Sequence, residues 1–226
     1  MKFTKTLLTT ALFSFSVLSA SQMVYAEAND TELVQQAVLS GGEQLQRALK
    51  ALKKGEFDTV ISLAQPLAEQ GNVIAQSTLA LAYEDKKEYF QAVKWYQKAA
   101  EQGLALAQYN LGVMYDKGKG VKQDYFQAFK WTQKAAEQGK INAQFNLALM
   151  YLNGQGVKQD DFQAVKWFQK AAEQGHATAQ AVLGAMYALG QGVKQDRNLA
   201  KMWAGKACEN GEQKGCDVYR MLNEGK

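Results

Sequence analysis

The chain has 226 residues, of which 47% are apolar and 21% are charged, and this ordinary globular composition excludes wholesale disorder. Nineteen glycines against a single proline exclude the collagen-like and proline-rich classes and favour helices that end at glycines. One histidine and two cysteines exclude a two-imidazole site or a four-ligand zinc site, so we expect no metal and no cofactor, and 26 basic against 22 acidic residues do not indicate nucleic-acid binding.

The first 26 residues have the features of a secretory signal peptide. Two lysines come before an apolar run from Leu7 to Leu18, and Ala26 stands before an acidic residue. A transmembrane anchor, the alternative, needs ~18 or more consecutive apolar residues, and no cysteine near the cleavage site could carry a lipid. We therefore expect cleavage after about Ala26 and a periplasmic or secreted mature chain, residues 27–226, without a membrane span.

Residues 27–71 are predicted to form N-terminal helices that include a degenerate leading repeat. A first helix around residues 43–54 would carry three leucines on one face. Residues 55–71 have the pattern of a second helix, which ends at a glycine.

From residue 72 onward the sequence repeats with a period of 36 residues. Residues 104–139 match residues 140–175 at 24 of 36 positions without a gap, which is typical of a repeat array. The first unit is four residues shorter, because the loop around residues 84–88 is trimmed. The predicted units are 72–103, 104–139, 140–175 and 176–211, followed by a capping helix in 212–226, and each unit contains one tryptophan: Trp95, Trp131, Trp167 and Trp203.

Each unit is predicted to fold as two antiparallel helices, called helix A and helix B below. In the second unit Leu111 and Tyr115 lie on the apolar face of helix A, and Gly118 ends it. Ala128 and Trp131 lie on the apolar face of helix B, so the tryptophan is expected in the core and not in a ligand cage. The glycine-rich turn lacks the preceding strand and the lysine ending that a phosphate-binding loop requires.

Two aspartates stand at the predicted starts of helix B. Asp124 and Asp160 each come three residues before a glutamine, the spacing of a capping box, in which the carboxylate accepts a backbone N–H bond and the glutamine reaches back. A carboxylate pair could instead serve acid–base catalysis, but each aspartate has a complete local role as a cap. We therefore expect no catalytic residue and a non-enzymatic protein.

The pattern A-x-x-x-L-G-x-M-Y-x-x-G-x-G-V-x-x-D, followed by A-x-x-W-x-x-x-A-A-E-x-G, is read from Ala107 to Gly139 and resembles the Sel-one-like repeat, a relative of the tetratricopeptide repeat. The resemblance covers about residues 72–211, with Ala80 and Ala148 in place of a helix A glycine. It implies an all-α fold, a right-handed α-solenoid of antiparallel helix pairs. It also implies a role as an adaptor in protein complexes, with no catalytic residue to carry over.

Cys208 and Cys216 are eight positions apart at the end of the last unit. In an exported chain a disulfide is expected, and the spacing resembles that of secreted cysteine-rich members of the family, some of which are linked with penicillin binding. Two free thiols are the alternative. The bond would tie the last helix B to a terminal helix around residues 212–223, in which Gly215 and Tyr219 are expected to face the core.

The leading functional hypothesis is a module that holds a protein or peptide partner on the concave surface lined by helix A. An aromatic anchor such as Tyr109 or Phe145 would supply most of the binding energy. The alternative is that these side chains only pack helix A against neighbouring helices. The candidate partner-binding residues are Leu106, Tyr109, Val113, Asn142, Phe145, Leu149 and Leu152.

Two further functions are alternatives to that hypothesis. Binding or hydrolysis of β-lactams is suggested only by the cysteine-rich relatives, and the chain lacks the Ser-x-x-Lys and Lys-Thr-Gly motifs of the serine mechanism. Binding of cell-wall glycan through the concave aromatic residues is the other open alternative.

Overall fold

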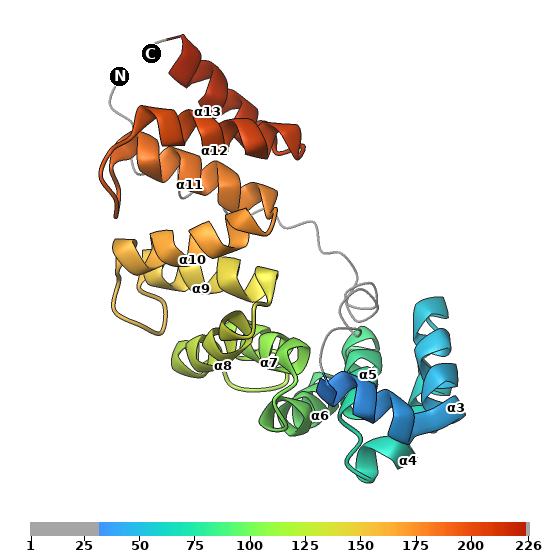
Figure 1. Ribbon diagram of the computed structural model, residues 1–226. Coiled ribbons are helices and arrows are strands. Elements are labelled where there is room, and N and C mark those ends of the chain that lie inside the picture. The colour runs from blue at the N-terminus through green and yellow to red at the C-terminus, as the bar shows by residue number, and fades with distance from the viewer. Residues whose placement is uncertain (1–31, 225–226) are drawn as a thin grey trace. The chain divides into compact units, whose positions relative to one another are not determined.

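The computed structural model describes residues 32–224, and over this range the chain forms helices joined by short turns, with no strand (Figure 1). The all-α repeat fold expected from the sequence is confirmed, whereas the expected signal peptide lies outside the described residues. None of the described helices has the length and apolar character that a membrane crossing requires. The helices are α3 (Glu32–Lys54), α4 (Phe57–Glu69), α5 (Val73–Asp85), α6 (Tyr89–Glu101), α7 (Ala105–Lys117), α8 (Tyr125–Glu137), α9 (Ile141–Asn153), α10 (Asp161–Glu173), α11 (Ala177–Leu189), α12 (Arg197–Glu209) and α13 (Gln213–Asn223).

The described helices form two compact units, residues 32–135 and residues 136–224, with the boundary in the last turn of α8. Within a unit, consecutive helices pack side by side, as α5 does with α6 and α11 does with α12 (Figure 1). Helix α3 begins earlier than the sequence indicated and is kinked at Gly42, where φ is 53°.

Nine helices, α4 to α12, are each 13 residues long, which corresponds to ~20 Å. The turn from helix A to helix B begins at a glycine in the left-handed conformation, such as Gly118 with a φ of 65°. In the first repeat, where this loop is shorter, Lys87 adopts the left-handed conformation instead, with a φ of 62°. The loop therefore changes its length while the paired helices keep theirs.

The helix B tryptophans belong to the core, as the sequence indicated. Trp95, Trp131 and Trp203 are buried, and Trp167 keeps part of its surface exposed. Small alanines lie one turn before and after each ring, and Ala128 and Ala135 beside Trp131 are fully buried. A large ring between two small side chains fills the space between adjacent helices.

A buried glutamine occupies the same position in α5, α7, α9 and α11 and bonds to the end of the preceding helix. Its Nε2 donates to the carbonyl oxygen eight residues earlier, near the end of the preceding helix B, at 2.9 to 3.3 Å. In three of the repeats its Oε1 accepts a bond from an amide that follows the next helix B, at 2.7 to 2.9 Å. Buried amides bonded in this way add stability, because no polar group is left unsatisfied. We call this set the glutamine ladder: Gln76, Gln108, Gln144 and Gln180.

The last helix, α13, is fastened to α12. The expected disulfide joins Cys208 to Cys216, whose Cα atoms are 4.6 Å apart. Arg197, at the start of α12, donates a hydrogen bond to the carbonyl oxygen of Leu222 at 2.5 Å. Both ends of α13 are therefore held against α12.

The expectation that both Gly215 and Tyr219 face the core is only half right. Gly215 is buried so closely against α12 that an added Cβ would lie 2.4 Å from the Cβ of Ala207. Tyr219 is 42% exposed, and its ring lies beside Gly205. In the described part of the chain no helix B follows α13, so the face that such a helix would cover stays open.

Candidate functional site

The helix A candidates of residues 32–135 lie on α7. Leu106 is buried, whereas Tyr109 and Val113 each keep part of their surface exposed. Residues four apart lie on the same face of a helix, so Tyr109 and Val113 form one small apolar patch. A partner could contact this patch but not Leu106.

The helix A candidates of residues 136–224 lie on α9. Asn142 and Leu149 are partly exposed, whereas Leu152 is buried and Phe145 is only 2% exposed. The ring of Phe145 lies 5.6 Å from that of Phe168 and stacks on the ring of His176 at 4.4 Å. Phe145 is therefore a core residue, which leaves Tyr109 as the aromatic anchor of the hypothesis.

The residue that precedes helix A differs from repeat to repeat. Asn72 and His176 both cap their helices, His176 by accepting the backbone N–H of Ala179 on Nδ1 at 3.2 Å. Burial lowers the pKa of His176, and the nearby carboxylate of Glu212 opposes this shift. Lys140 at the same position is 7% exposed, and burial lowers its pKa to about 8.

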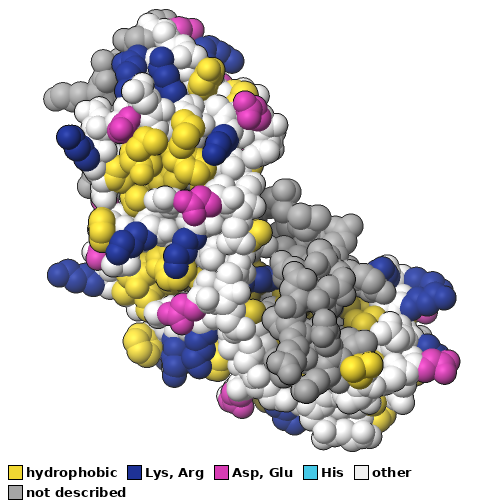
Figure 2. Space-filling model, in the orientation of Figure 1, with side chains coloured by type: hydrophobic (Ala, Val, Ile, Leu, Met, Phe, Trp, Pro, Cys, Tyr) yellow, Lys and Arg dark blue, Asp and Glu magenta, His cyan; other side chains and the backbone are white. Residues whose placement is uncertain are grey.

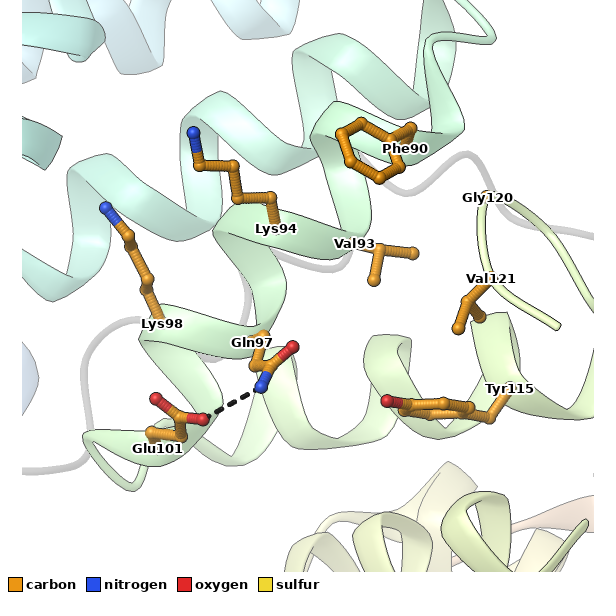
Figure 3. A pocket seen from close by; sticks show the side chains of 9 residues that line it. All are labelled: Phe90, Val93, Lys94, Gln97, Lys98, Glu101, Tyr115, Gly120 and Val121. Carbon is orange, nitrogen blue, oxygen red and sulfur yellow. Dashed lines mark hydrogen bonds between the residues drawn. The ribbon is translucent and has the colours of Figure 1, made fainter. Parts of the chain in front are cut away.

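The outer face of helix B carries a second candidate surface, the α6 groove. Figure 3 shows Phe90 and Val93 of α6 beside Tyr115 of α7 and Val121 of the turn that follows α7. The groove encloses about 440 Å³, and Phe90 at its end is 71% exposed. Polar side chains form the rest of the lining, with Gln97 donating to Glu101 at 3.0 Å. The remaining lining residues are Lys94, Lys98 and Gly120.

The turn after α7 shapes this groove, because it lies directly against the start of α6. A Cβ at Gly120 would lie 2.3 Å from the carbonyl oxygen of Tyr89, so only glycine fits there. The same close approach occurs in residues 136–224, where a Cβ at Gly192 would lie 2.3 Å from the carbonyl oxygen of Asp161. Backbone contact therefore fixes the wall of the α6 groove, and it fixes the matching turn in residues 136–224 in the same way.

The equivalent surface of residues 136–224, called the α10 surface here, has the same composition. Phe162 on α10 is 57% exposed. Tyr187 and Val193 pack against the core cluster that contains Val165. In the other unit, Tyr115 and Val121 pack against the core cluster that contains Val93. Figure 2 shows hydrophobic side chains gathered in patches on this unit, with lysine and arginine side chains beside them.

Lysines of helix B stand over its aromatic rings. The Nζ atoms of Lys98 and Lys94 lie 4.3 and 6.0 Å from the centre of the Trp95 ring. On α10, Lys170 and Lys166 lie 4.1 and 4.4 Å from the tryptophan and phenylalanine rings. Within residues 39–224, none of these four ammonium groups forms an ion pair with a carboxylate, so all four are available to an anionic partner.

The aspartates at the start of helix B act as caps, as expected, but the glutamine half of the capping box is not formed, because the backbone N–H groups of Asp124 and Asp160 donate to the carbonyl oxygens of Tyr115 and Tyr151 at 3.0 and 2.9 Å. Oδ1 of Asp124 and Oδ1 of Asp160 each accept the backbone N–H three residues later at 3.0 Å. In the part of the chain that the structure describes, no three His, Cys, Asp or Glu side chains are grouped in a way that could hold a metal ion.

The α6 groove was not expected from the sequence, although a signal was present. Phenylalanine recurs at Phe90, Phe126 and Phe162 with the 36-residue period, and lysines follow each of them four and eight positions later. These phenylalanines lie outside the buried stripe of helix B, and all three are exposed. Repetition of an aromatic residue at a solvent-facing position could have identified the surface.

Comparisons with known proteins place these features in context. The model of the Sel1 repeat family matches residues 75–104, 105–140, 141–176 and 177–212. Among curated proteins, none is similar enough in sequence to count as a relative.

Several solved structures are similar to this chain. A protective antigen present in uropathogenic Escherichia coli strains, with an SLR fold, is 36% identical over 82% of this chain with a TM-score of 0.73, and the match spans only 42% of that protein. A Sel1 repeat protein from Oxalobacter formigenes is 32% identical over 77% of this chain and 73% of its own, with a TM-score of 0.70. YrrB, a TPR protein with an unusual peptide-binding site, is 19% identical over 89% of this chain and 98% of its own, with a TM-score of 0.53, and is similar in fold alone.

Proposed function

Since this chain belongs to the Sel1 repeat family, whose members generally mediate protein–protein interactions, we propose that it is an exported, non-enzymatic scaffold that binds a protein or peptide through helix A. The observation that carries the proposal is the pair Tyr109 and Val113, which stays partly exposed on α7 while Leu106 beside it is buried. A tyrosine that is apolar along its ring and polar at its tip is a frequent anchor of protein interfaces.

The helix A residues of α9 extend the proposal to residues 136–224. Asn142 and Leu149 would contact the partner, whereas Phe145 and Leu152 would support them from the core. The binding energy would then come from a few side chains and not from the whole length of the helix.

Two observations support export. The disulfide between Cys208 and Cys216 is of the kind that persists in oxidising compartments. The similar Escherichia coli protein is described as a protective antigen, which suits a protein located outside the cytoplasm. Amino-terminal sequencing of protein from the periplasm should find a chain that begins near Glu27, and a cytoplasmic chain that begins at Met1 would refute export.

Photo-crosslinking from a single position tests the helix A surface. A photoreactive phenylalanine analogue at Tyr109 should capture one specific protein in intact cells, and the additional change Val113→Glu should abolish the capture. The matched control is the same analogue at Tyr219, which is 42% exposed on α13 and lies outside the proposed surface. Equal capture from both positions, or capture insensitive to Val113→Glu, would show that helix A is not the binding surface.

Affinity measured with the captured partner gives the second test. Tyr109→Ala should raise its Kd by ~10-fold or more if the ring is an anchor. Hydrolysis of a chromogenic β-lactam or retention on purified peptidoglycan would instead favour the two alternative functions, which gain no support from the described residues.

A further inference from the structure

The α6 groove combines an apolar floor with a cationic rim. Val93, Tyr115 and Val121 form the floor, and Lys94 and Lys98 stand along one side (Figure 3). We propose that this groove is a second docking surface, which binds a short acidic peptide segment of a partner by enclosing one of its apolar side chains. This inference goes beyond the helix A proposal and does not depend on it.

The charge around the groove favours an acidic segment. Of the charged side chains that line the groove, Lys94 and Lys98 are positive and Glu101 is negative, and Lys119 on the turn, which also interacts with Glu84, adds a positive charge beside it. Glu101 already accepts a hydrogen bond from Gln97, whereas neither Lys94 nor Lys98 pairs with a carboxylate among the described residues. Carboxylates of a bound peptide would supply the missing partners.

The lysines are already held in place before a partner arrives. Lys98 lies 4.3 Å from the centre of the Trp95 ring, and Lys119 lies 5.1 Å from that of Tyr89. Side chains ordered in advance lose less conformational entropy on binding. Each aromatic ring thus holds the ammonium group of its lysine in place on the rim, where the ammonium group can contact a carboxylate of the peptide.

The floor favours a peptide that carries an apolar side chain. A volume of about 440 Å³ is at the small end of ligand pockets and suits one or two side chains. Phe90 protrudes at the end of the groove and could cover the inserted side chain. A purely acidic segment would leave both of these apolar features unused.

A peptide suits the groove better than an anionic bilayer does. The floor is recessed between α6 and the turn that carries Gly120, and that turn lies in backbone contact with α6. A flat lipid surface would reach Phe90 but not Val121 at the floor, and it would bring its headgroups against Glu101. A narrow chain enters such a recess and can place its carboxylates beside Lys94 and Lys98, on the side away from Glu101.

The repetition of the same residues in the other unit supports a binding role. The α10 surface presents Phe162 and Val165 with Lys166 and Lys170, and Gln169 again bonds a glutamate, here at 2.8 Å. The last repeat, in contrast, has Asn198 and Met202 at the positions of the phenylalanine and the first lysine, so the arrangement is kept only in part of the array. The chain therefore offers equivalent contacts to two acidic segments.

Methyl NMR of the full chain with a short peptide in which two leucines stand among glutamates is the direct test. Addition of this peptide should shift the methyl signals of Val93 and Val121, and those of Val165 and Val193 on the α10 surface. The shifts should weaken when salt is raised from ~50 mM to ~500 mM, because the contacts on the rim are exposed to solvent. Shifts at Val113 and Leu149 alone would overturn the proposal.

Charge reversal provides matched variants, and all the altered side chains line exposed surface. Lys94→Glu with Lys98→Glu should weaken binding at the α6 groove by ~10-fold or more, whereas Arg47→Glu with Lys50→Glu on α3 changes the net charge equally and should have little effect. Equal losses in the two double variants would show that the peptide senses net charge only, which contradicts a groove site.

Two further probes separate the apolar and lipid contributions. Phe90→Ser should weaken binding by ~3-fold or more, because the cover over the inserted side chain is lost, and a peptide with both leucines replaced by glycine should bind ~3-fold or more weakly, because the floor is then unused. Vesicles of phosphatidylglycerol should not compete with the peptide. Vesicle binding that Phe90→Ser abolishes, with no peptide binding, would identify a membrane contact and refute the peptide site.

Discussion

Phe145 and Phe162 belong to one helix pair and differ completely in their surroundings. Phe145 on α9 is 2% exposed, between the rings of Phe168 and His176. Phe162 on α10 is 57% exposed, and Lys166 stands over its ring. The position within the pair, and not the residue type, decides whether an aromatic ring joins the core or faces solvent.

The packing of the helices explains the difference. Within its unit α11, a helix A, packs against α10, α12 and also α13, while α5 packs against α3, α4 and α6 (Figure 1). Helix A thus contacts the next helix A as well as its flanking helix B. On helix B the tryptophan lies on the buried face, whereas the phenylalanine near its start, such as Phe90 or Phe162, lies on the solvent-facing side.

The largest expected effect is a difference in protein stability between variants at these two phenylalanines. Phe145→Ala should lower the free energy of unfolding by ~3–5 kcal/mol, as expected for a buried ring that leaves a cavity. Phe162→Ala should lower it by less than ~1 kcal/mol, because its ring is mostly in water. Urea denaturation of both variants measures the difference, and similar losses would break the distinction between helix A and helix B.

The next effect concerns α13, a helix A without a following helix B among the described residues. Reduction of the bond between Cys208 and Cys216, which closes a short loop, should cost ~2–3 kcal/mol by the chain-entropy model. Hydrogen exchange should then accelerate first in residues 212–224, while the tryptophan-containing repeats stay protected. Uniform acceleration along the chain would mean that the bond stabilises more than this end.

A smaller gain in stability is expected at the start of α9. Lys140 is buried with a pKa lowered to about 8, so at neutral pH the folded state holds a buried positive charge, which costs stability relative to the unfolded chain. Lys140→Leu, which copies Leu104 of the preceding repeat, should raise the free energy of unfolding by ~1–2 kcal/mol at pH 7. The advantage should shrink as the pH rises above 8, because the parent then buries a neutral amine. A loss of stability in urea at pH 7 would show that the ammonium group is needed there.

The smallest effect is a pH dependence at the start of α11. Burial lowers the pKa of His176, so the unfolded chain binds a proton more readily than the folded chain does. The folded state is therefore stable relative to the unfolded state above the usual histidine pKa of 6.5, and it loses stability as the pH falls below that value. Protonation would also remove the acceptor of the Ala179 N–H bond, a cap worth ~1 kcal/mol. His176→Asn, which copies the cap of Asn72, should flatten the unfolding profile between pH 7.5 and ~5.5. An unchanged slope would place the titration elsewhere.

The repeat period made much of the fold predictable, because helix-forming stripes and glycine stops recur in register. Asp124, Trp131 and Gly118 lie as the sequence indicated, since each acts through neighbours close in sequence or through the repeat itself. The sequence prediction placed Tyr219 in the core because it treated α13 as a further helix A. Among the described residues no helix B covers that side of α13, so Tyr219 stays partly exposed.

The binding surface was harder to predict for a physical reason. An apolar stripe in a sequence shows which face of a helix avoids water, but it does not show whether that face packs in the core or binds a partner. Phe145 was therefore predicted to be a ligand contact, although its stripe packs the core. The α6 groove is built between α6 and the turn after α7, and the depth of the recess at Gly120 depends on backbone contact that no sequence pattern reports.

The glutamine ladder and the disulfide turn out to share one register. Each rung links residues eight apart across a helix junction, such as Gln180 to Ala172, and Cys216 and Cys208 stand one period further on at the same two places. The disulfide is thus a covalent rung of the same register, at the place where the other units carry an amide and a backbone carbonyl. A reductant would therefore open this junction chemically, whereas the amide rungs open only when their helices separate.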